Sequence, residues 1–204
     1  VIEIDRELAA QLQDRFGTNT GFTLHISDVL KFDFDTLPSP QDGFRILGNL
    51  PYNISTPLLF HLLNYHEKIH DMVFMLQLEV VKRMVAGVGD NNYGRLGIMI
   101  QYYCAVEKLF TVPANAFNPA PKVESAIVKL RPHTPLPFPA QNTKMLEQVV
   151  RTAFTQRRKT IRNSLKNLLS AEQLEELNID NSLRPENISL QDYVRISDFV
   201  TQQN

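Results

Sequence analysis

Apolar and polar positions alternate with two different spacings along the first 130 residues. Short runs rich in β-branched and aromatic residues predict strands near 1–5, 22–27, 44–49 and 72–78. Runs with an apolar residue every three or four positions predict helices near 6–16, 56–65, 79–86 and 95–104. Two more strands, near 105–112 and 122–130, predict an antiparallel pair at the edge of the sheet. This alternation is typical of βα units, so it predicts an α/β fold with a largely parallel sheet.

The remainder of the chain has a different pattern. The segment 131–142, "RPHTPLPFPAQN", holds four of the twelve prolines and predicts a linker, because proline resists both helix and sheet. Beyond it, helical periodicity covers 143–156, 158–169, 171–177 and 189–202. The sequence therefore predicts an α/β domain at 1–132 and a small all-helical domain at 143–204. Ser55 and Ser189 are the expected caps of the helices that follow them.

Composition narrows the function classes. The chain has 204 residues, of which 43% are hydrophobic, and its net charge is −1, so bulk charge does not mark it as a binder of polyanions. The single cysteine, Cys104, lies in an apolar run and is expected in the core. No apolar run approaches the length of a membrane span. His61, His66 and His70 lack the cysteine and carboxylate neighbours of a metal site. We expect a cytoplasmic protein without a metal.

A stiff turn follows the strand near 44–49. Gly48 permits a close approach of the backbone, and Pro51 restricts the turn. Asn49 supplies an amide oxygen that can accept a hydrogen bond from an amino group, and Tyr52 offers a ring on which a base can stack. An ordinary β-turn is the alternative, since asparagine and proline are common turn residues. The position at the carboxyl end of a strand favours a binding site.

Two carboxylates follow early strands. Glu3 ends the first predicted strand, and Asp28 comes directly after the second. In a nucleotide-binding α/β fold, carboxylates at such positions accept hydrogen bonds from ribose hydroxyls or from an adenine amino group. For Glu3 the alternative is a solvated strand-end carboxylate, with Asp5 competing for any role. For Asp28 the alternative is a helix or turn cap.

Two further features point to a nucleic-acid substrate. Phe117, in the proline-rich turn "NAFNPAPKVESAIV", is either a buried loop residue or a second wall of a base pocket. No acidic residue occurs between Glu147 and Glu172, a segment that contains Arg151, Arg157, Arg158, Lys159, Arg162 and Lys166. A run of one sign predicts a phosphate-binding surface, and a solvated helix face is the alternative. Lys82, Arg83 and Arg95 are candidates to extend it.

Five stretches carry a resemblance to a known family: "VIEIDRELAAQL", "GNLPYNISTPLLFHLL", "FMLQLEVVKRMVAG…YGRL", "FNPAPKVESAIVKL" and "AFTQRRKTIRNSL". They cover essentially the whole chain, and the sequence resembles the rRNA adenine dimethyltransferases, in particular the bacterial enzymes that modify 16S rRNA. One departure is Leu78, where the family commonly has lysine. The resemblance implies a Rossmann-like class I methyltransferase sheet that uses S-adenosylmethionine as methyl donor.

The resemblance also implies roles for the residues above. Glu3 would bind the ribose hydroxyls of the cofactor, Asp28 its adenine, and Asn49 would border it. Asn49, Leu50, Pro51 and Tyr52 would hold the target base, with Phe117 as the second aromatic wall. The basic helical domain would bind 16S rRNA in the small ribosomal subunit. The implied reaction forms N6,N6-dimethyladenosine at two adjacent adenosines near the 3′ end, with a role in subunit biogenesis, by an enzyme that is a monomer when full length.

One expected part of the family pattern has no counterpart in these 204 residues. The family has a first strand and a glycine-rich E/D-x-G-x-G loop before the strand that corresponds to 1–5. The doubly wound strand order places that first strand between the strands near 1–5 and 44–49. We therefore expect this sequence to be a fragment that lacks the central strand and has no activity by itself.

Two other function classes remain open at this point. A non-catalytic rRNA-binding assembly factor would keep the basic helices without the cofactor site, and the presence of Glu3, Asp28 and the turn at 49–52 argues against it. A DNA adenine methyltransferase would use a similar turn, but the helical domain fits that class poorly. Transfer of a labelled methyl group to unmethylated small subunits distinguishes the three.

Overall fold

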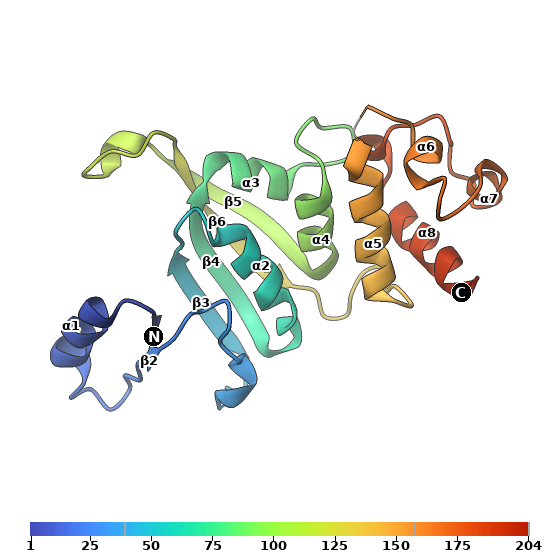
Figure 1. Ribbon diagram of the computed structural model, residues 1–204. Coiled ribbons are helices and arrows are strands. Elements are labelled where there is room, and N and C mark those ends of the chain that lie inside the picture. Colours follow the sequence, from blue (N-terminus) through green and yellow to red (C-terminus); the bar gives the residue numbers. More distant parts are fainter. Residues whose placement is uncertain (39, 157, 204) are drawn as a thin grey trace.

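The computed structural model describes residues 1–38, 40–156 and 158–203 (Figure 1). Its strands are β1 (Ile2–Glu3), β2 (His25–Ile26), β3 (Phe44–Asn49), β4 (Ile69–Gln77), β5 (Cys104–Val112) and β6 (Ser125–Pro132). Its α-helices are α1 (Arg6–Phe16), α2 (Ser55–Leu63), α3 (Leu78–Val85), α4 (Arg95–Tyr103), α5 (Thr143–Ala153), α6 (Ile161–Leu165), α7 (Ala171–Glu176) and α8 (Leu190–Gln202). Mixed sheet followed by helices confirms the predicted fold class.

The strands form two separate sheets. The larger has the order β3-β4-β6-β5, in which β3 and β4 are parallel and β6 runs antiparallel to both of its neighbours, so the predicted antiparallel edge pair is confirmed. The smaller sheet contains only β1 and β2, which are parallel. Within the described residues, β1 and β3 do not pair with each other. The space between these two strands is where the sequence predicts a missing central strand.

Two hydrophobic cores hold the molecule together. Alternate residues of β4, among them Phe74 and Leu76, point to one face and pack with Leu59 of α2 and Met84 of α3. Successive side chains of a strand point to opposite faces, so these alternate residues all lie on the face of the sheet that the helices cover. Cys104 is buried in the same core, as predicted, and its burial raises the pKa of the thiol to about 12.

The second core belongs mainly to the helical part. Val149, Val150 and Ala153 of α5 pack with Ile196 of α8, and the same cluster includes Met99 and other residues of α4. The division into domains at 1–132 and 143–204 stays a prediction, since this core extends across the linker onto α4. No helix in the described ranges is long and apolar enough to cross a membrane.

Two local predictions are wrong. Ser55 does not cap α2, because the helix begins at Ser55 itself after Ile54, and the hydroxyl donates to the Tyr52 carbonyl instead. The helix expected over 158–169 is reduced to the five residues of α6, because Thr160 is extended and the Ile161 N–H donates to the Leu183 carbonyl. Ser189 does cap α8, with its side chain accepting from the Asp192 N–H.

Candidate active site

The turn after β3 is fixed by its own backbone and by β4. The Leu50 N–H donates to the Met75 carbonyl at 3.4 Å, and the Ile54 N–H donates to the Pro51 carbonyl at 3.2 Å. Gly48 allows the close packing here, since a Cβ at this position would lie 2.7 Å from a Leu50 methyl. Leu50 itself is buried. The turn is thus a rigid extension of the sheet.

Tyr52 is fixed at both ends. Its carbonyl accepts a hydrogen bond from the Ser55 hydroxyl at 3.0 Å, and its phenolic oxygen is 3.0 Å from the Ser125 hydroxyl oxygen on β6. The residue is nevertheless 40% exposed. An aromatic ring with a fixed orientation and an accessible surface is suited to stacking against a planar group.

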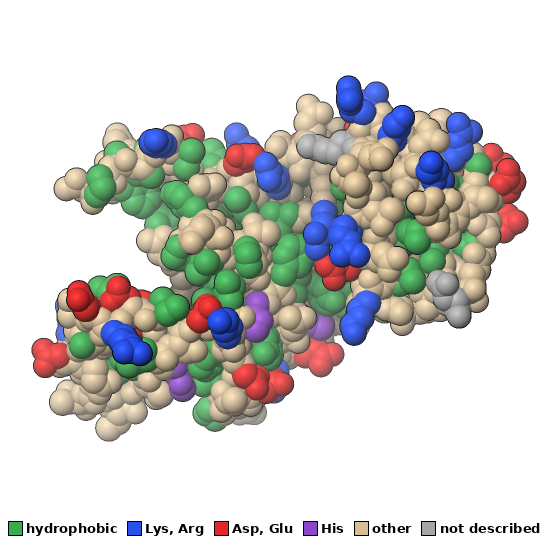
Figure 2. Space-filling model, viewed as in Figure 1, with side chains coloured by type: hydrophobic (Ala, Val, Ile, Leu, Met, Phe, Trp, Pro, Cys, Tyr) green, Lys and Arg blue, Asp and Glu red, His purple; other side chains and the backbone are tan. Residues whose placement is uncertain are grey.

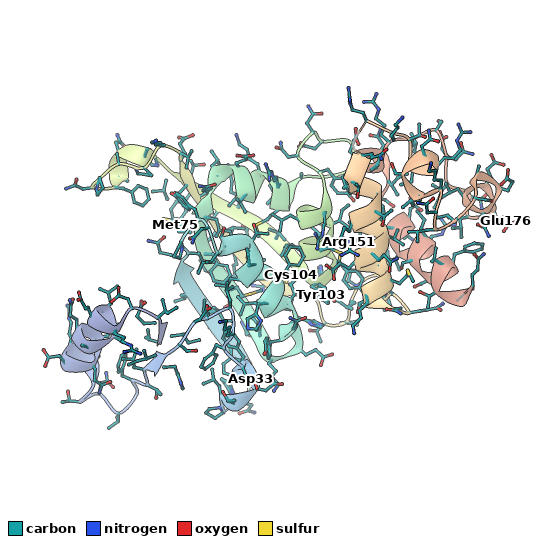
Figure 3. The ribbon with its side chains drawn as sticks, in the orientation of Figure 1. Asp33, Met75, Tyr103, Cys104, Arg151 and Glu176 are labelled. Carbon is teal, nitrogen blue, oxygen red and sulfur yellow. The ribbon has the colours of Figure 1, made fainter. Side chains whose placement is uncertain are left out.

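The Asn49 side chain is exposed, and no other residue in the described ranges forms a hydrogen bond with it. Its amide is therefore available to a ligand. Asn49 ends β3 and pairs with Met75 of β4, and Met75 is labelled in Figure 3. The carboxyl ends of two parallel strands meet here, which is where open α/β sheets bind their ligands.

A cavity of about 1030 Å³ lies between the two sheets. Its lining includes Glu3, Asp28, Asn49, Leu50 and Pro51, so the structure brings together five of the residues that the sequence singles out. Apolar side chains complete the lining, among them Ile2, Ile4, Val29, Leu30, Ile46 and Leu47. A polar rim on an apolar hollow is the usual character of a small-molecule site.

The early carboxylates differ in their contacts and in whether they line the cavity. Asp5 caps α1, since its side chain accepts from the N–H groups of Glu7 and Leu8. Glu3 faces the cavity and uses one oxygen to accept from the Asp5 N–H at 2.8 Å. Asp28 accepts from the Leu30 N–H at 3.0 Å, so it serves its own turn and lines the cavity as well. Asp5 is not among the residues that line the cavity, so Glu3 and Asp28 stay the predicted ligand-binding carboxylates.

Phe117 follows the short 3₁₀ helix η3 (Ala114–Ala116) in the connection between β5 and β6, which projects from the sheet (Figure 1). It is partly exposed and is not among the residues that line the cavity. The described ranges contain no ring contact between Phe117 and Tyr52. Its role as a second wall therefore stays a prediction.

A basic surface covers the helical part. Its described members are exposed and form no ion pair with any described acidic residue: Arg151, Arg158, Lys159, Arg162 and Lys166. Arg157 lies outside the described residues. Figure 2 shows blue side chains over the end of the molecule that carries α6, and Figure 3 places Arg151 on α5. We call this set the basic surface.

Of the three residues expected to extend the basic surface, Lys82 is exposed and has no ion-pair partner among the described residues, whereas the other two are ion-paired. Arg83 forms an ion pair with Glu79 in α3, and Arg95 forms one with Glu147 of α5 at 2.7 Å. Each charge is compensated by its partner. The described ranges also contain no group of three His, Cys, Asp or Glu side chains that could hold a metal ion.

Ser125 has no predicted role of its own, although it lies in the segment "FNPAPKVESAIVKL" that carries part of the family resemblance. Serine is a common strand residue, and its partner Tyr52 lies 73 positions away. The available signal is weak: Ser125 directly precedes the apolar run "AIV", and its position in the strand is completely buried.

Comparisons with known proteins agree on one family. The family described as ribosomal RNA adenine dimethylase matches residues 1–202. A protein of Pseudomonas putida named ribosomal RNA small subunit methyltransferase A is 54% identical over all of this chain and 76% of its own length. A protein of the same name from Marinobacter nauticus is 56% identical over 98% of this chain and 72% of its own length.

Solved structures show the same relationship. A dimethyladenosine transferase from Plasmodium falciparum superimposes with a TM-score of 0.79 at 28% identity, over 96% of this chain and 78% of that one. The 23S rRNA methyltransferase ErmE superimposes with a TM-score of 0.70 at 22% identity, over 98% of this chain and 81% of that one, and shows the shared fold. By its sequence along almost its whole length, this chain belongs to the ribosomal RNA adenine dimethylase family.

Proposed function

We propose that the protein transfers methyl groups from S-adenosylmethionine to the N6 amino groups of two adjacent adenosines near the 3′ end of 16S rRNA in the small subunit. The product is N6,N6-dimethyladenosine. The relatives' name, ribosomal RNA small subunit methyltransferase A, supports the substrate, and family membership supports the reaction. We further propose that the protein acts as a monomer in the cytoplasm and contributes to small-subunit biogenesis.

One observation carries the proposal. The free amide of Asn49 and the fixed ring of Tyr52 come from one rigid turn; Asn49 lines the cavity together with Glu3 and Asp28, whereas Tyr52, three positions further on, is not among the lining residues. A group held by the turn and a nucleoside held in the cavity would therefore meet at the carboxyl end of β3. Methyl transfer requires such a meeting, because positioning of the two reactants supplies a large part of the rate.

The cavity suits the nucleoside portion of S-adenosylmethionine. Glu3 and Asp28 each use one carboxylate oxygen in a local backbone bond, and the described residues contribute no partner for the other oxygen. Glu3 would accept from the ribose hydroxyls and Asp28 from the adenine amino group, and Val29 and Leu30, which line the cavity, would contact the faces of the adenine ring. When bound, S-adenosylmethionine supplies an electrophilic methyl group.

The protein's own residues act on the target base. The N6 amino nitrogen of the target adenine is a poor nucleophile, because its lone pair is delocalised into the purine ring. The Asn49 side-chain oxygen accepts from an amino hydrogen, with a backbone carbonyl near Leu50 as the second acceptor, and this favours a tetrahedral nitrogen. Tyr52, with Phe117, holds the base once it has left its stack. The basic surface binds the phosphates of the surrounding rRNA.

Methyl transfer tests the proposal directly. Radiolabelled S-adenosylmethionine and the full-length protein are incubated with unmethylated small subunits, and the digested rRNA is analysed for labelled N6,N6-dimethyladenosine. Large subunits and already methylated small subunits are the control substrates. We expect label only in the unmethylated small subunit. Label in the large subunit would refute the substrate, and binding of small subunits without label would favour the assembly factor.

A further inference from the structure

One hydrogen bond joins two distant parts of the chain at the candidate active site. The hydroxyl oxygens of Tyr52 and Ser125 are 3.0 Å apart, although 73 positions separate the two residues. Tyr52 belongs to the turn after β3, and Ser125 is the first residue of β6. Because β4 lies between these strands, the tyrosine side chain reaches across the carboxyl end of β4.

Ser125 is an immobile partner. Its backbone pairs with Gln77 of β4 on one side and with Val112 of β5 on the other. Its relative exposure is 0%, and the next residue of the strand, Ala126, is also fully buried. A buried hydroxyl destabilises the fold unless it has a hydrogen-bond partner, so an alanine would fill position 125 equally well if only packing mattered. The hydroxyl of Ser125 instead serves as the hydrogen-bond partner of the Tyr52 hydroxyl.

Tyr52 is different, because its ring must stay accessible. The residue is 40% exposed, and only its two ends are fixed, by Ser55 at the carbonyl and by Ser125 at the phenolic oxygen. Without the second bond, the ring is free to rotate about its side-chain torsions at the surface. A ring that already has its binding orientation loses less conformational freedom when a ligand stacks on it.

We propose that Ser125 is a positioning residue for base methylation: its hydroxyl holds the Tyr52 ring in the orientation in which the target adenine stacks beside Asn49. This inference rests on the proposed function. Ser125 acts through Tyr52 and contacts neither the base nor the cofactor. The bond also gives a physical reason why the turn at 49–52 and the segment around Ser125 occur together in this chain.

The test compares matched variants of the full-length protein on unmethylated small subunits. Ser125→Ala and Tyr52→Phe each remove one partner of the bond, and the double variant removes both. Ser197→Ala is the control, because Ser197 is also 0% exposed and its hydroxyl donates to the Val194 carbonyl in α8, far from the turn. The measurements are kcat, the Kd for small subunits and the Tm of each variant.

We expect Ser125→Ala and Tyr52→Phe to lower kcat by about 3- to 10-fold, the effect of losing one neutral hydrogen bond. The double variant should be no slower than the slower single variant, because the same bond is absent in all three. The Kd for small subunits should stay within twofold, since the basic surface is intact. Ser197→Ala should lose as much Tm as Ser125→Ala while its kcat is unchanged.

Three results overturn the inference: an unchanged kcat in Tyr52→Phe, equal kcat values for Ser125→Ala and Ser197→Ala, or multiplicative effects in the double variant. Tyr52→Phe alone is decisive if Ser125→Ala does not fold, because Tyr52 is a surface residue. Failure of the proposed function is recognised separately. In that case the unmodified protein itself transfers no methyl group, and the inference falls with the function.

Discussion

The two sides of the cavity are built in different ways. On the side formed by the turn at 48–52, which is proposed to hold the base and is called the base side, α2 buries five residues, and hydrogen bonds from β4, α2 and β6 hold the turn in place. On the side formed by β1, α1 and β2, which is proposed to hold the cofactor and is called the cofactor side, α1 buries only Ala9, and β1 and β2 are two residues each and pair only with each other among the described strands. Figure 1 shows this unit set apart from the larger sheet.

Within the described residues, the turn at 48–52 is held by several neighbouring elements, whereas β1 and β2 support only each other. The backbone of Asn49 and the ring of Tyr52 are held in place because their hydrogen-bond partners come from neighbouring strands and helices. Glu3 and Asp28 are proposed to bind the cofactor, but β1 and β3 lie on opposite sides of a largely apolar cavity and do not pair with each other. Leu47 of β3 is 78% exposed at this edge. Pre-organisation therefore belongs to the base side.

The largest expected effect is on the base side. Asn49→Ala should lower kcat by about 10²–10³-fold, the usual result of removing a hydrogen-bond partner used in the transition state. The fold should be unaffected, because the side chain is exposed. Methyl transfer and thermal unfolding are measured for this variant and for Asn64→Ala, an exposed asparagine at the end of α2. A kcat near that of Asn64→Ala would contradict the role of Asn49.

The basic surface lies at the opposite end of the molecule from α1, which makes a second comparison possible. Replacing Arg158, Arg162 and Lys166 with glutamine should lower the affinity for small subunits and reduce the log–log salt slope by about 0.7–0.9 for each lost phosphate contact. The control replaces three exposed basic residues on the cofactor side: Arg6, Arg15 and Lys31. An unchanged slope, or an equal change in the control, would mean that the basic surface is only a solvated face.

The open edge predicts self-association of a protein made of residues 1–204. Unpaired parallel edges and an exposed leucine recruit other chains, and a lysine at an edge opposes this pairing. Leu47→Lys should therefore lower the weight-average mass measured by light scattering at micromolar concentration. Val88→Lys is the control, since Val88 is 53% exposed in a loop and lies on no strand. Equal masses for the two variants would show that the edge is not responsible.

The smallest expected effect is on the pH dependence of stability, and it concerns Cys104 in the hydrophobic core. Burial raises the pKa of Cys104 from 9.0 to about 12, so the folded state keeps this proton after the unfolded state has lost it. The stability that Cys104 contributes is fully present below pH 9 and is lost as the pH rises towards 12. Cys104→Ala should reduce the slope of unfolding free energy against pH in this range, by at most about 1.4 kcal/mol per pH unit. Identical slopes would place the thiol in contact with water.

Local patterns were sufficient for much of the fold. Helix α1 occupies the predicted residues 6–16, and β3 the predicted residues 44–49, because amphipathic periodicity and β-branched runs act within a few residues of the chain. The chemistry of the turn at 48–52 was also legible, since glycine, asparagine and proline restrict the backbone wherever they occur. The antiparallel position of β5 and β6 followed from the short connection between them.

Only the tertiary structure decided the rest, because it depends on contacts between residues far apart in sequence. The hydrogen bond from Tyr52 to Ser125 exists because strand order places β6 beside β4. Ser55 bonds to the Tyr52 carbonyl rather than capping α2, since the turn delivers that carbonyl to it. The charge of Arg95 is compensated because the packing of α5 brings Glu147 within 2.7 Å of it. A pattern in one dimension records which groups are present, and packing determines which of them remain free to act.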